Sequence, residues 1–273
     1  MKYKSILFVL LLCCSTLQAT ILTGKTDDIL SVSPSGNVNY SIPLNLKSGI
    51  SSFTPQLSLV YSGQTTNGPL GIGWSISGIS SISIVPRNVH FDTKAEQLYQ
   101  SPDNAYSLDG NRLLLVSGGN GMSGSRYRTE NDQYNVISIE GQAGNTPKSF
   151  IVKATDGSIY RYGSATGRLT YNGNSACSWM LDYAEDILGN FIRYEYTTDN
   201  LTLRLNKITY GQNKHNSNSI PLTVIFEYSS RNDSIPVHIF ESNGFLSKRL
   251  SNIICQYGGQ TYRSYSLQYG TRC

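Results

Sequence analysis

Short runs of alternating apolar and polar residues recur along the whole chain, and this pattern limits the possible folds most strongly. A period of two is typical of strands that bury one face, because successive side chains point to opposite sides of a sheet. Such runs occur at residues 42–46, 57–61, 74–77, 82–84, 136–139, 150–152, 194–196, 203–205, 222–228 and 265–269. We therefore expect an all-β fold of many short, mainly antiparallel strands that form a curved sheet or a shell-like module.

Turn residues separate these runs, as expected for sheets built from neighbouring strands. Asp109-Gly110 is a preferred two-residue hairpin connector, and Pro34-Ser-Gly36 predicts a tight turn. With only 8 alanines in 273 residues, we expect under about a tenth of the chain to be helical. The one candidate helical turn is Trp179 to Leu188, for which a strand running into a turn is an equal alternative. Ser117 to Arg126 has the composition of a flexible loop.

The first 19 residues predict a secretory signal peptide, and residues 20–273 a single β-rich domain. Lys2 and Lys4 precede an apolar stretch that is too short to cross a bilayer, and Ala19 is a small residue suited to cleavage. Lipoprotein anchoring at Cys13 or Cys14 is the alternative, although neither follows a small residue. No later stretch approaches 18 apolar residues, so we expect secretion without an integral membrane segment.

Three cysteines follow the signal, namely Cys177, Cys255 and Cys273. They are too few for a disulfide scaffold and too far apart for paired zinc ligands, so we interpret them as inert thiols. His90, His215 and His238 are isolated, and no Gly-x-Ser-x-Gly motif is present. We therefore predict no catalytic, cofactor-binding or metal-binding residues.

The glycine-rich segment Gly68 to Gly73 superficially resembles a phosphate loop. A helix would have to follow such a loop, whereas Trp74-Ser-Ile-Ser has the period of a strand. We expect these glycines to let backbone pass close to the Trp74 indole. A net charge of +4 with 15% charged residues also argues against nucleic-acid binding.

Tyrosines are abundant in the second half of the chain and have two interpretations. They stabilise sheets as cross-strand pairs, or they line a sugar-binding face. The residues concerned are Tyr160, Tyr162, Tyr194, Tyr196, Tyr210, Tyr228, Tyr257, Tyr262, Tyr265 and Tyr269.

Several sequence tags resemble one family in both content and order. The first lie in residues 31–84, which include Phe53-Thr-Pro-Gln-Leu-Ser-Leu-Val-Tyr-Ser62 and Asn67-Gly-Pro-Leu-Gly-Ile-Gly-Trp-Ser. Later tags are Tyr106-Ser-Leu-Asp-Gly-Asn-Arg-Leu113, Tyr127-Arg-Thr-Glu130, Ala154-Thr-Asp-Gly157, Tyr160-Arg-Tyr-Gly163, Trp179-Met-Leu181, Asp186-Ile-Leu-Gly-Asn190 and Tyr194-Glu-Tyr196. Over roughly residues 28 to 270 the chain resembles the SpvB family, the N-terminal domain of the Salmonella virulence plasmid B protein. The same domain begins the B components of insecticidal Tc toxins.

The resemblance implies a secreted, non-enzymatic module of a toxin or virulence protein, part of a shell that encloses or delivers a C-terminal payload. Some relatives carry an ADP-ribosyltransferase with a Glu-x-Glu pair, which this sequence lacks, so we expect no enzymatic activity and no cofactor. The alternative is an extracellular module that binds carbohydrate or protein through its tyrosine-rich face.

The chain ends shortly after the alternating run Tyr265-Ser-Leu-Gln-Tyr269. A strand at an open sheet edge exposes unpaired N–H and C=O groups and invites pairing with another chain. We therefore expect a C-terminally incomplete domain whose last strand is covered by further toxin-complex polypeptide or a downstream Rhs-like segment. Cys273 would then be exposed and free to cross-link.

Overall fold

The computed structural model describes residues 28–34, 36–96, 104–171 and 174–270. Of these residues 62% are in strands and 3% are helical, so the predicted all-β class is confirmed. All pairings between the strands are antiparallel, and most join strands that are neighbours in the chain.

The N-terminal part forms a four-stranded sheet in the order β1-β2-β3-β6. Its strands are β1 (Ile29–Val32), β2 (Val38–Pro43), β3 (Ser58–Ser62) and β6 (Trp74–Ser77), with a 3₁₀ turn at Ile50–Ser52. The predicted turn after Pro34 is present, because the Gly36 N–H donates to the Ser33 carbonyl at 2.9 Å. Pro43 is tolerated in β2 because β1 pairs only as far as Ser41. A small hairpin, β4 (Asn67–Gly68) and β5 (Gly71–Ile72), lies between β3 and β6.

Eight strands then close into a ring. They are β7 (Ser81–Val85), β8 (Ala105–Leu108), β9 (Asn111–Ser117), β10 (Arg126–Thr129), β11 (Val136–Ala143), β12 (Thr146–Lys153), β13 (Ile159–Tyr162) and β15 (Ser175–Glu185). The ring closes at β15, which pairs with both β13 and β7. The short strand β14 (Arg168–Tyr171) also pairs with β15, and the helix α1 (Val89–Asp92) connects β7 to β8.

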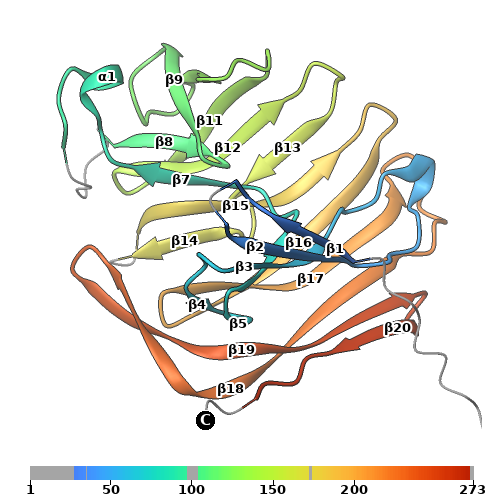
Figure 1. Cartoon of the computed structure of the whole chain (residues 1–273). Coiled ribbons are helices and arrows are strands. Elements are labelled where there is room, and N and C mark those ends of the chain that lie inside the picture. Colours follow the sequence, from blue (N-terminus) through green and yellow to red (C-terminus); the bar gives the residue numbers. More distant parts are fainter. Residues whose placement is uncertain (1–27, 35, 97–103, 172–173, 271–273) are drawn as a thin grey trace, which may run out of the picture.

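From β15 the same sheet continues outside the ring as an antiparallel meander. Its strands are β16 (Asn190–Asp199), β17 (Thr202–Asn213), β18 (Leu222–Ile239), β19 (Ser242–Tyr257) and β20 (Gln260–Ser266). Figure 1 shows this meander curving around the blue N-terminal sheet. The contact is direct, because the backbone N–H groups of Asn45 and Lys47 donate to the hydroxyls of Tyr265 and Tyr262, at 2.9 and 3.1 Å. The expected curved, shell-like sheet is therefore present.

A single buried core links the ring, the meander and the N-terminal sheet. Inside the closed ring of strands, the aromatic side chains of Tyr106, Phe150 and Trp179 pack edge to face, with centroids 5.0 to 5.8 Å apart. This geometry is favourable because the positive edge of one ring faces the negative face of the next. These aromatic side chains thus occupy the interior of the closed ring of strands.

The structure decides several local predictions. Trp179 to Leu188 is strand as far as Glu185 and then a turn, so the helical alternative is wrong. The helix is instead α1, where the Asn88 side chain accepts from the Phe91 N–H at 3.0 Å and caps the first turn. Asp109-Gly110 forms the predicted hairpin turn, with positive φ at both residues.

The glycine-rich segment before β10 is a loop, as its composition predicted. It is a series of turns in which Gly118, Gly121 and Gly124 take positive φ angles. The Tyr127 hydroxyl accepts from the Gly121 N–H at 2.7 Å, and the Gln142 amide donates to the Gly121 carbonyl at 2.9 Å. The glycines therefore serve the turn geometry of a hydrogen-bonded segment.

Candidate functional site

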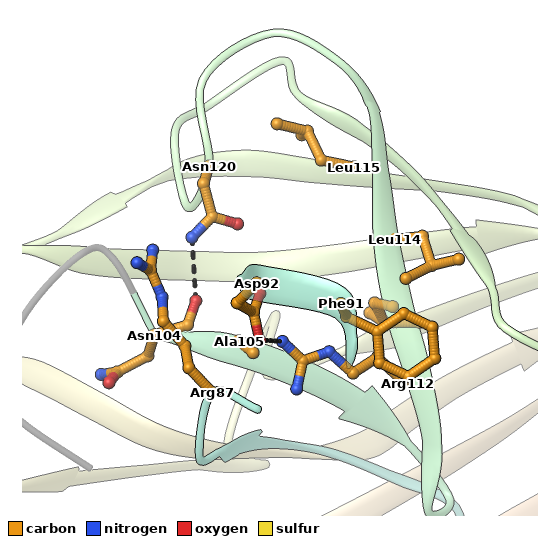
Figure 2. A pocket seen from close by; sticks show the side chains of 10 residues that line it. Arg87, Phe91, Asp92, Asn104, Ala105, Arg112, Leu114, Leu115 and Asn120 are labelled. Atoms are coloured by element: carbon orange, nitrogen blue, oxygen red, sulfur yellow. Dashed lines mark hydrogen bonds and ion pairs between the residues drawn. The ribbon is translucent and has the colours of Figure 1, made fainter. Parts of the chain in front are cut away.

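A cavity of about 330 Å³ opens beside α1, between the helix and the strands β8 and β9. Figure 2 shows that arginine, asparagine and leucine side chains share its walls. Arg87 and Asp92 come from the segment around α1, Arg112 from β9, and Asn120 from the turns before β10. The closed ring brings these four residues together from positions up to 33 apart in the chain (120 − 87).

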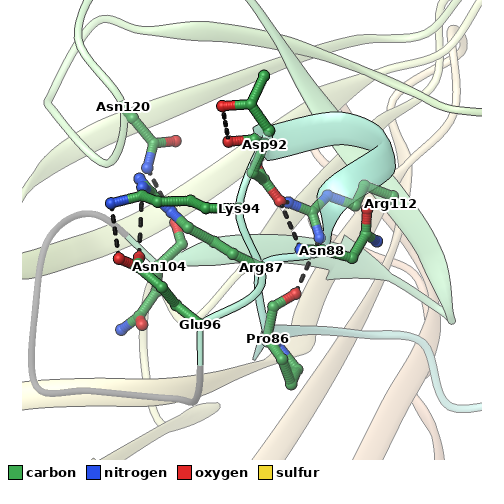
Figure 3. A network of polar contacts seen from close by, with 10 residues as sticks. Pro86, Arg87, Asn88, Asp92, Lys94, Glu96, Asn104, Arg112 and Asn120 are labelled. Carbon is green, nitrogen blue, oxygen red and sulfur yellow. Dashed lines mark hydrogen bonds and ion pairs between the residues drawn. The ribbon is translucent and has the colours of Figure 1, made fainter.

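Arg112 is the central charged group of this cavity and is buried. Its guanidinium forms a close ion pair with Asp92 and donates to the Pro86 carbonyl at 3.0 Å, as Figure 3 shows. It also lies over the Phe91 ring, 5.5 Å from the centroid. Asp92 accepts a second hydrogen bond from the Asn88 N–H at 2.9 Å. The pair therefore fixes α1 on the ring, as buried charges require partners.

The other polar groups of the cavity are also engaged in structural contacts. The Asn120 amide donates to the Asn104 carbonyl at 2.9 Å and accepts from the Tyr127 hydroxyl at 3.1 Å. Arg87 lies 3.6 Å from Glu96, which also pairs with Lys94 at 2.6 Å (Figure 3). The arrangement stabilises the segment between β7 and β8 and supplies no adjacent nucleophile and base among the described residues.

Sequence reasoning did not single out Arg87, Asp92 or Arg112. The one available signal was the position of Arg112, two residues after the Asp109-Gly110 turn at the start of a hairpin strand. The alternation of apolar and polar residues in β9 does not indicate that Arg112 is buried. Its partner Asp92 is 20 residues away in the sequence. Within the described residues, no three histidine, cysteine, aspartate or glutamate side chains gather as a metal site.

The glycine-rich segment around β4 and β5 leads into strand β6, as predicted, and is fastened by an arginine. The Arg231 side chain, 2% exposed, donates to the Gly68 carbonyl at 3.0 Å and to the Asn67 side-chain oxygen at 2.9 Å. It also pairs with Asp233 at 2.9 Å. Hydrogen bonds from Arg231 and Asn67 hold the pKa of Asp233 well below its usual range, which keeps the pair ionised in mild acid.

The expected role of these glycines needs one correction. A Cβ on Gly73 would lie 2.3 Å from the Tyr61 ring, so the close approach is to Tyr61. Tyr61 in turn packs on Trp74, with centroids 5.5 Å apart. The absence of a side chain at Gly73 therefore leaves space for the Tyr61 ring, and it is Tyr61 that contacts the Trp74 indole.

We predict that Arg231→Met destabilises the protein by about 1–3 kcal/mol, the usual cost of leaving buried polar groups unpaired. The Gly68 carbonyl and the Asn67 side-chain oxygen lose their partner, while the Asn67 amide still donates to Asp233 of β18 at 3.2 Å. Urea denaturation followed by circular dichroism measures the loss. Arg126→Met, an exposed arginine on β10, is the control, and an equal loss in both variants contradicts the prediction.

The tyrosines of the candidate sugar-binding face are mostly part of the core. Tyr162, Tyr194, Tyr196 and Tyr210 are each at most 7% exposed, and Tyr257 is the clearly exposed one at 44%. The hydroxyls of Tyr196 and Tyr210 donate to the backbone carbonyls of Leu181 and Lys47, both at 2.8 Å, and the Tyr162 hydroxyl forms a hydrogen bond of 2.9 Å with the Ser80 hydroxyl. Burial raises the pKa of each of the four above its usual range. The structure therefore supports the sheet-stabilising interpretation of these rings.

Cys177 and Cys255 are buried and free, whereas Cys273 lies outside the described residues. Burial raises the pKa of both thiols to about 11. At pH 8 only about 0.1% of each thiol is then ionised, and the thiolate is the reactive form.

We expect Cys177 and Cys255 to react with Ellman's reagent only after unfolding. A variant that keeps these two cysteines and has serine at the other three isolates their signal. Its two thiols should not react with the reagent for hours in native buffer at pH 8, and should react at once in guanidinium. Rapid native reaction of either thiol contradicts this expectation.

Several strands in the described part of the chain pair on one side only, and β20, β1 and β6 are end strands of their sheets. β20 has β19 as its single neighbour, and β1 pairs only with β2. Ile29, Leu30 and Val32 of β1 are 64 to 68% exposed. Edge strands with free backbone groups are suited to pairing with another polypeptide.

No helix among the described residues has the length and apolar character that a bilayer crossing requires.

Taken together, a filled ring, a curved meander and open sheet edges define an all-β scaffold module. The model of the family described as Salmonella virulence plasmid 65kDa B protein, SpvB, matches residues 32–242. The chain therefore belongs to the SpvB family, as its sequence tags indicated. No curated protein matches the sequence.

Solved structures share the fold at low sequence identity. The N-terminal domain of effector protein SpvB from Salmonella typhimurium strain LT2 has a TM-score of 0.60 and 16% identity, covering 85% of this chain and 88% of that one. The crystal structure of TcdB2-TccC3 has a TM-score of 0.66 and 15% identity, covering 85% of this chain and 14% of that one. The Photorhabdus luminescens Tc holotoxin pore gives 0.66 and 14%, with coverages of 85% and 14%. This chain thus spans about a seventh of the Tc toxin chains (14%).

Proposed function

We propose that this protein is a secreted, non-enzymatic shell module that helps enclose or deliver a toxic payload carried by further polypeptide. The observation that carries the proposal is the family match over residues 32–242, together with the fold shared with TcdB2-TccC3. The curved meander of β15 to β20 supports it, because a curved sheet is a suitable wall for an enclosed space (Figure 1).

We further propose that the outer edge of β20 pairs with that polypeptide, in a toxin complex or an Rhs-like segment. Ser264 and Ser266 on this strand are exposed, and the inner face of the strand is held through Tyr262 and Tyr265. A rigid strand with one free edge needs little ordering before it accepts another strand. The signal peptide and the cleavage near Ala19 lie outside the described residues and remain part of this proposal.

The edge pairing is tested with a tagged chain expressed in the organism that encodes it. We expect light scattering to find the exported chain in an assembly with a larger mass than one mature chain. The double substitution Ser264→Lys and Ser266→Lys should release the chain from this assembly, because charged edge residues block strand addition. The control is Gln268→Lys, an exposed position beyond the strand. A monomeric wild type, or assembly that survives the edge lysines, overturns the proposal.

The absence of enzymatic activity is a prediction in its own right. We expect no transfer of label from radioactive NAD to actin or other host proteins, since the sequence holds no Glu-x-Glu pair to activate the transfer. An authentic ADP-ribosyltransferase serves as the positive control. Incorporation that persists after repurification contradicts the prediction.

A further inference from the structure

A second cavity, of about 400 Å³, lies on the sheet where the ring and the meander share β15. Its floor is a row across three strands, because Tyr183 on β15 is opposite Arg161 on β13 and Arg193 on β16. The turn after β13 forms one wall through Ser164, Ala165 and Thr166. A volume of this size is typical of small-molecule sites.

The wall of this cavity is fixed by a buried carboxylate. Asp182 is 3% exposed and accepts hydrogen bonds from the Ser164 hydroxyl and the Ala165 N–H, both at 2.6 Å. The Thr166 hydroxyl oxygen accepts from the Tyr196 N–H at 2.9 Å. The Ser164 hydroxyl oxygen can therefore still accept a hydrogen bond from a ligand, and the Thr166 hydroxyl can still donate one. The cavity is therefore pre-organised with both kinds of hydrogen-bonding group.

The charges around the cavity nearly cancel. Two arginines, Arg161 and Arg193, stand against three carboxylates, Asp182, Glu185 and Glu195. A strongly anionic ligand would meet the carboxylates, and a cationic one would meet the guanidinium groups. The lining therefore favours a neutral ligand that both donates and accepts hydrogen bonds.

Arg193 and Glu195 are the groups most open to such a ligand. Arg161 pairs with Glu140 at 3.2 Å, and Glu185 accepts from the Tyr183 hydroxyl at 2.7 Å. The Arg193 guanidinium lies 4.9 Å from the Phe191 ring centroid, and no described residue forms a hydrogen bond or ion pair with it. Glu195 has only a long contact of 3.6 Å with Lys207.

We propose that this cavity binds a neutral saccharide. Sugar hydroxyls would accept from Arg193 and Thr166 and donate to Glu195 and Ser164, while the half-buried Tyr183 ring offers apolar surface to the pyranose. Tyr194 of the tyrosine-rich face lies in the lining of this cavity, whereas the polar groups that would bind the ligand come from β15, β16 and the turn after β13. Saccharide binding does not depend on the shell function, because binding is a property of the chain by itself.

Saturation-transfer NMR on the full mature chain tests the proposal with four probes, the methyl pyranosides of glucose, galactose, mannose and N-acetylglucosamine. We expect saturable binding of at least one, weakened about tenfold by Arg193→Ala or Thr166→Val, the effect of losing one strong hydrogen bond. Arg126→Ala, an exposed arginine of β10 far along the ring, should leave binding unchanged.

Three results would overturn the inference. They are no saturable binding by any of the four glycosides, binding that both cavity variants leave intact, and an equal loss in Arg126→Ala. Circular dichroism confirms that each variant is folded. Arg193→Lys, which keeps the charge but loses the planar fork, is the second variant if Arg193→Ala fails to fold, and it should also weaken binding.

Discussion

Replacing Trp179 by alanine should destabilise the protein by about 3–5 kcal/mol, as large aromatic-to-alanine changes in cores do. Trp179 is fully buried at the centre of the ring. Its ring meets those of Phe150 and Tyr106 edge to face, with centroids 5.0 and 5.8 Å apart. Its indole N–H donates to the Pro147 carbonyl at 3.0 Å. The substitution removes all of these contacts and leaves a cavity that the closed ring of strands cannot readily collapse into.

Urea denaturation monitored by far-ultraviolet circular dichroism measures this loss. Trp179→Phe is the matched variant, because phenylalanine retains most of the aromatic packing and loses only the indole N–H and part of the volume. We expect it to cost clearly less than the alanine variant. Equal, small losses in the two variants would show that the ring interior is not the main source of stability.

Gly78→Ala should be nearly as damaging, with an expected loss of about 3 kcal/mol or more, in the upper range for single substitutions. Gly78 follows β6 and leads into β7, so it joins the N-terminal sheet to the ring. Its φ angle is +91°, and an added Cβ would lie 1.7 Å from the Gln56 carbonyl oxygen. Because the obstacle is backbone next to β3, the variant has to displace a strand and cannot simply rotate a side chain.

Gly36→Ala is the matched control for Gly78→Ala. Gly36 has a similar φ of +81°, but nothing lies within 4 Å of an added Cβ. It should therefore show only the cost of placing alanine in the left-handed region, about 1–2 kcal/mol. Thermal unfolding of both variants separates the two contributions, and equal midpoints would contradict the predicted backbone clash.

The sequence was sufficient to predict fold class and the local turns. Alternation at Leu222 to Tyr228 and the Asp109-Gly110 turn depend on neighbouring residues only, and both are found as predicted. The ambiguous segment from Trp179 shows the limit of this reasoning. Its apolar residues suit a helix or a strand, and pairing with β13, β7 and β16 decides in favour of strand.

The candidate sites depend on contacts that no local pattern encodes. Arg112 meets Asp92 because the ring closes, and Arg231 meets Asn67 across 164 residues because the meander curves back over the N-terminal sheet. Likewise Arg161, Tyr183 and Arg193 form one row only through the strand register around β15. By itself the sequence determined strands, turns and family, since these follow from side-chain periodicity and short-range backbone preferences. Only the tertiary structure decided ring closure, the partners of the buried charges and the two cavities, because these arise from hydrogen-bond register and packing between distant segments.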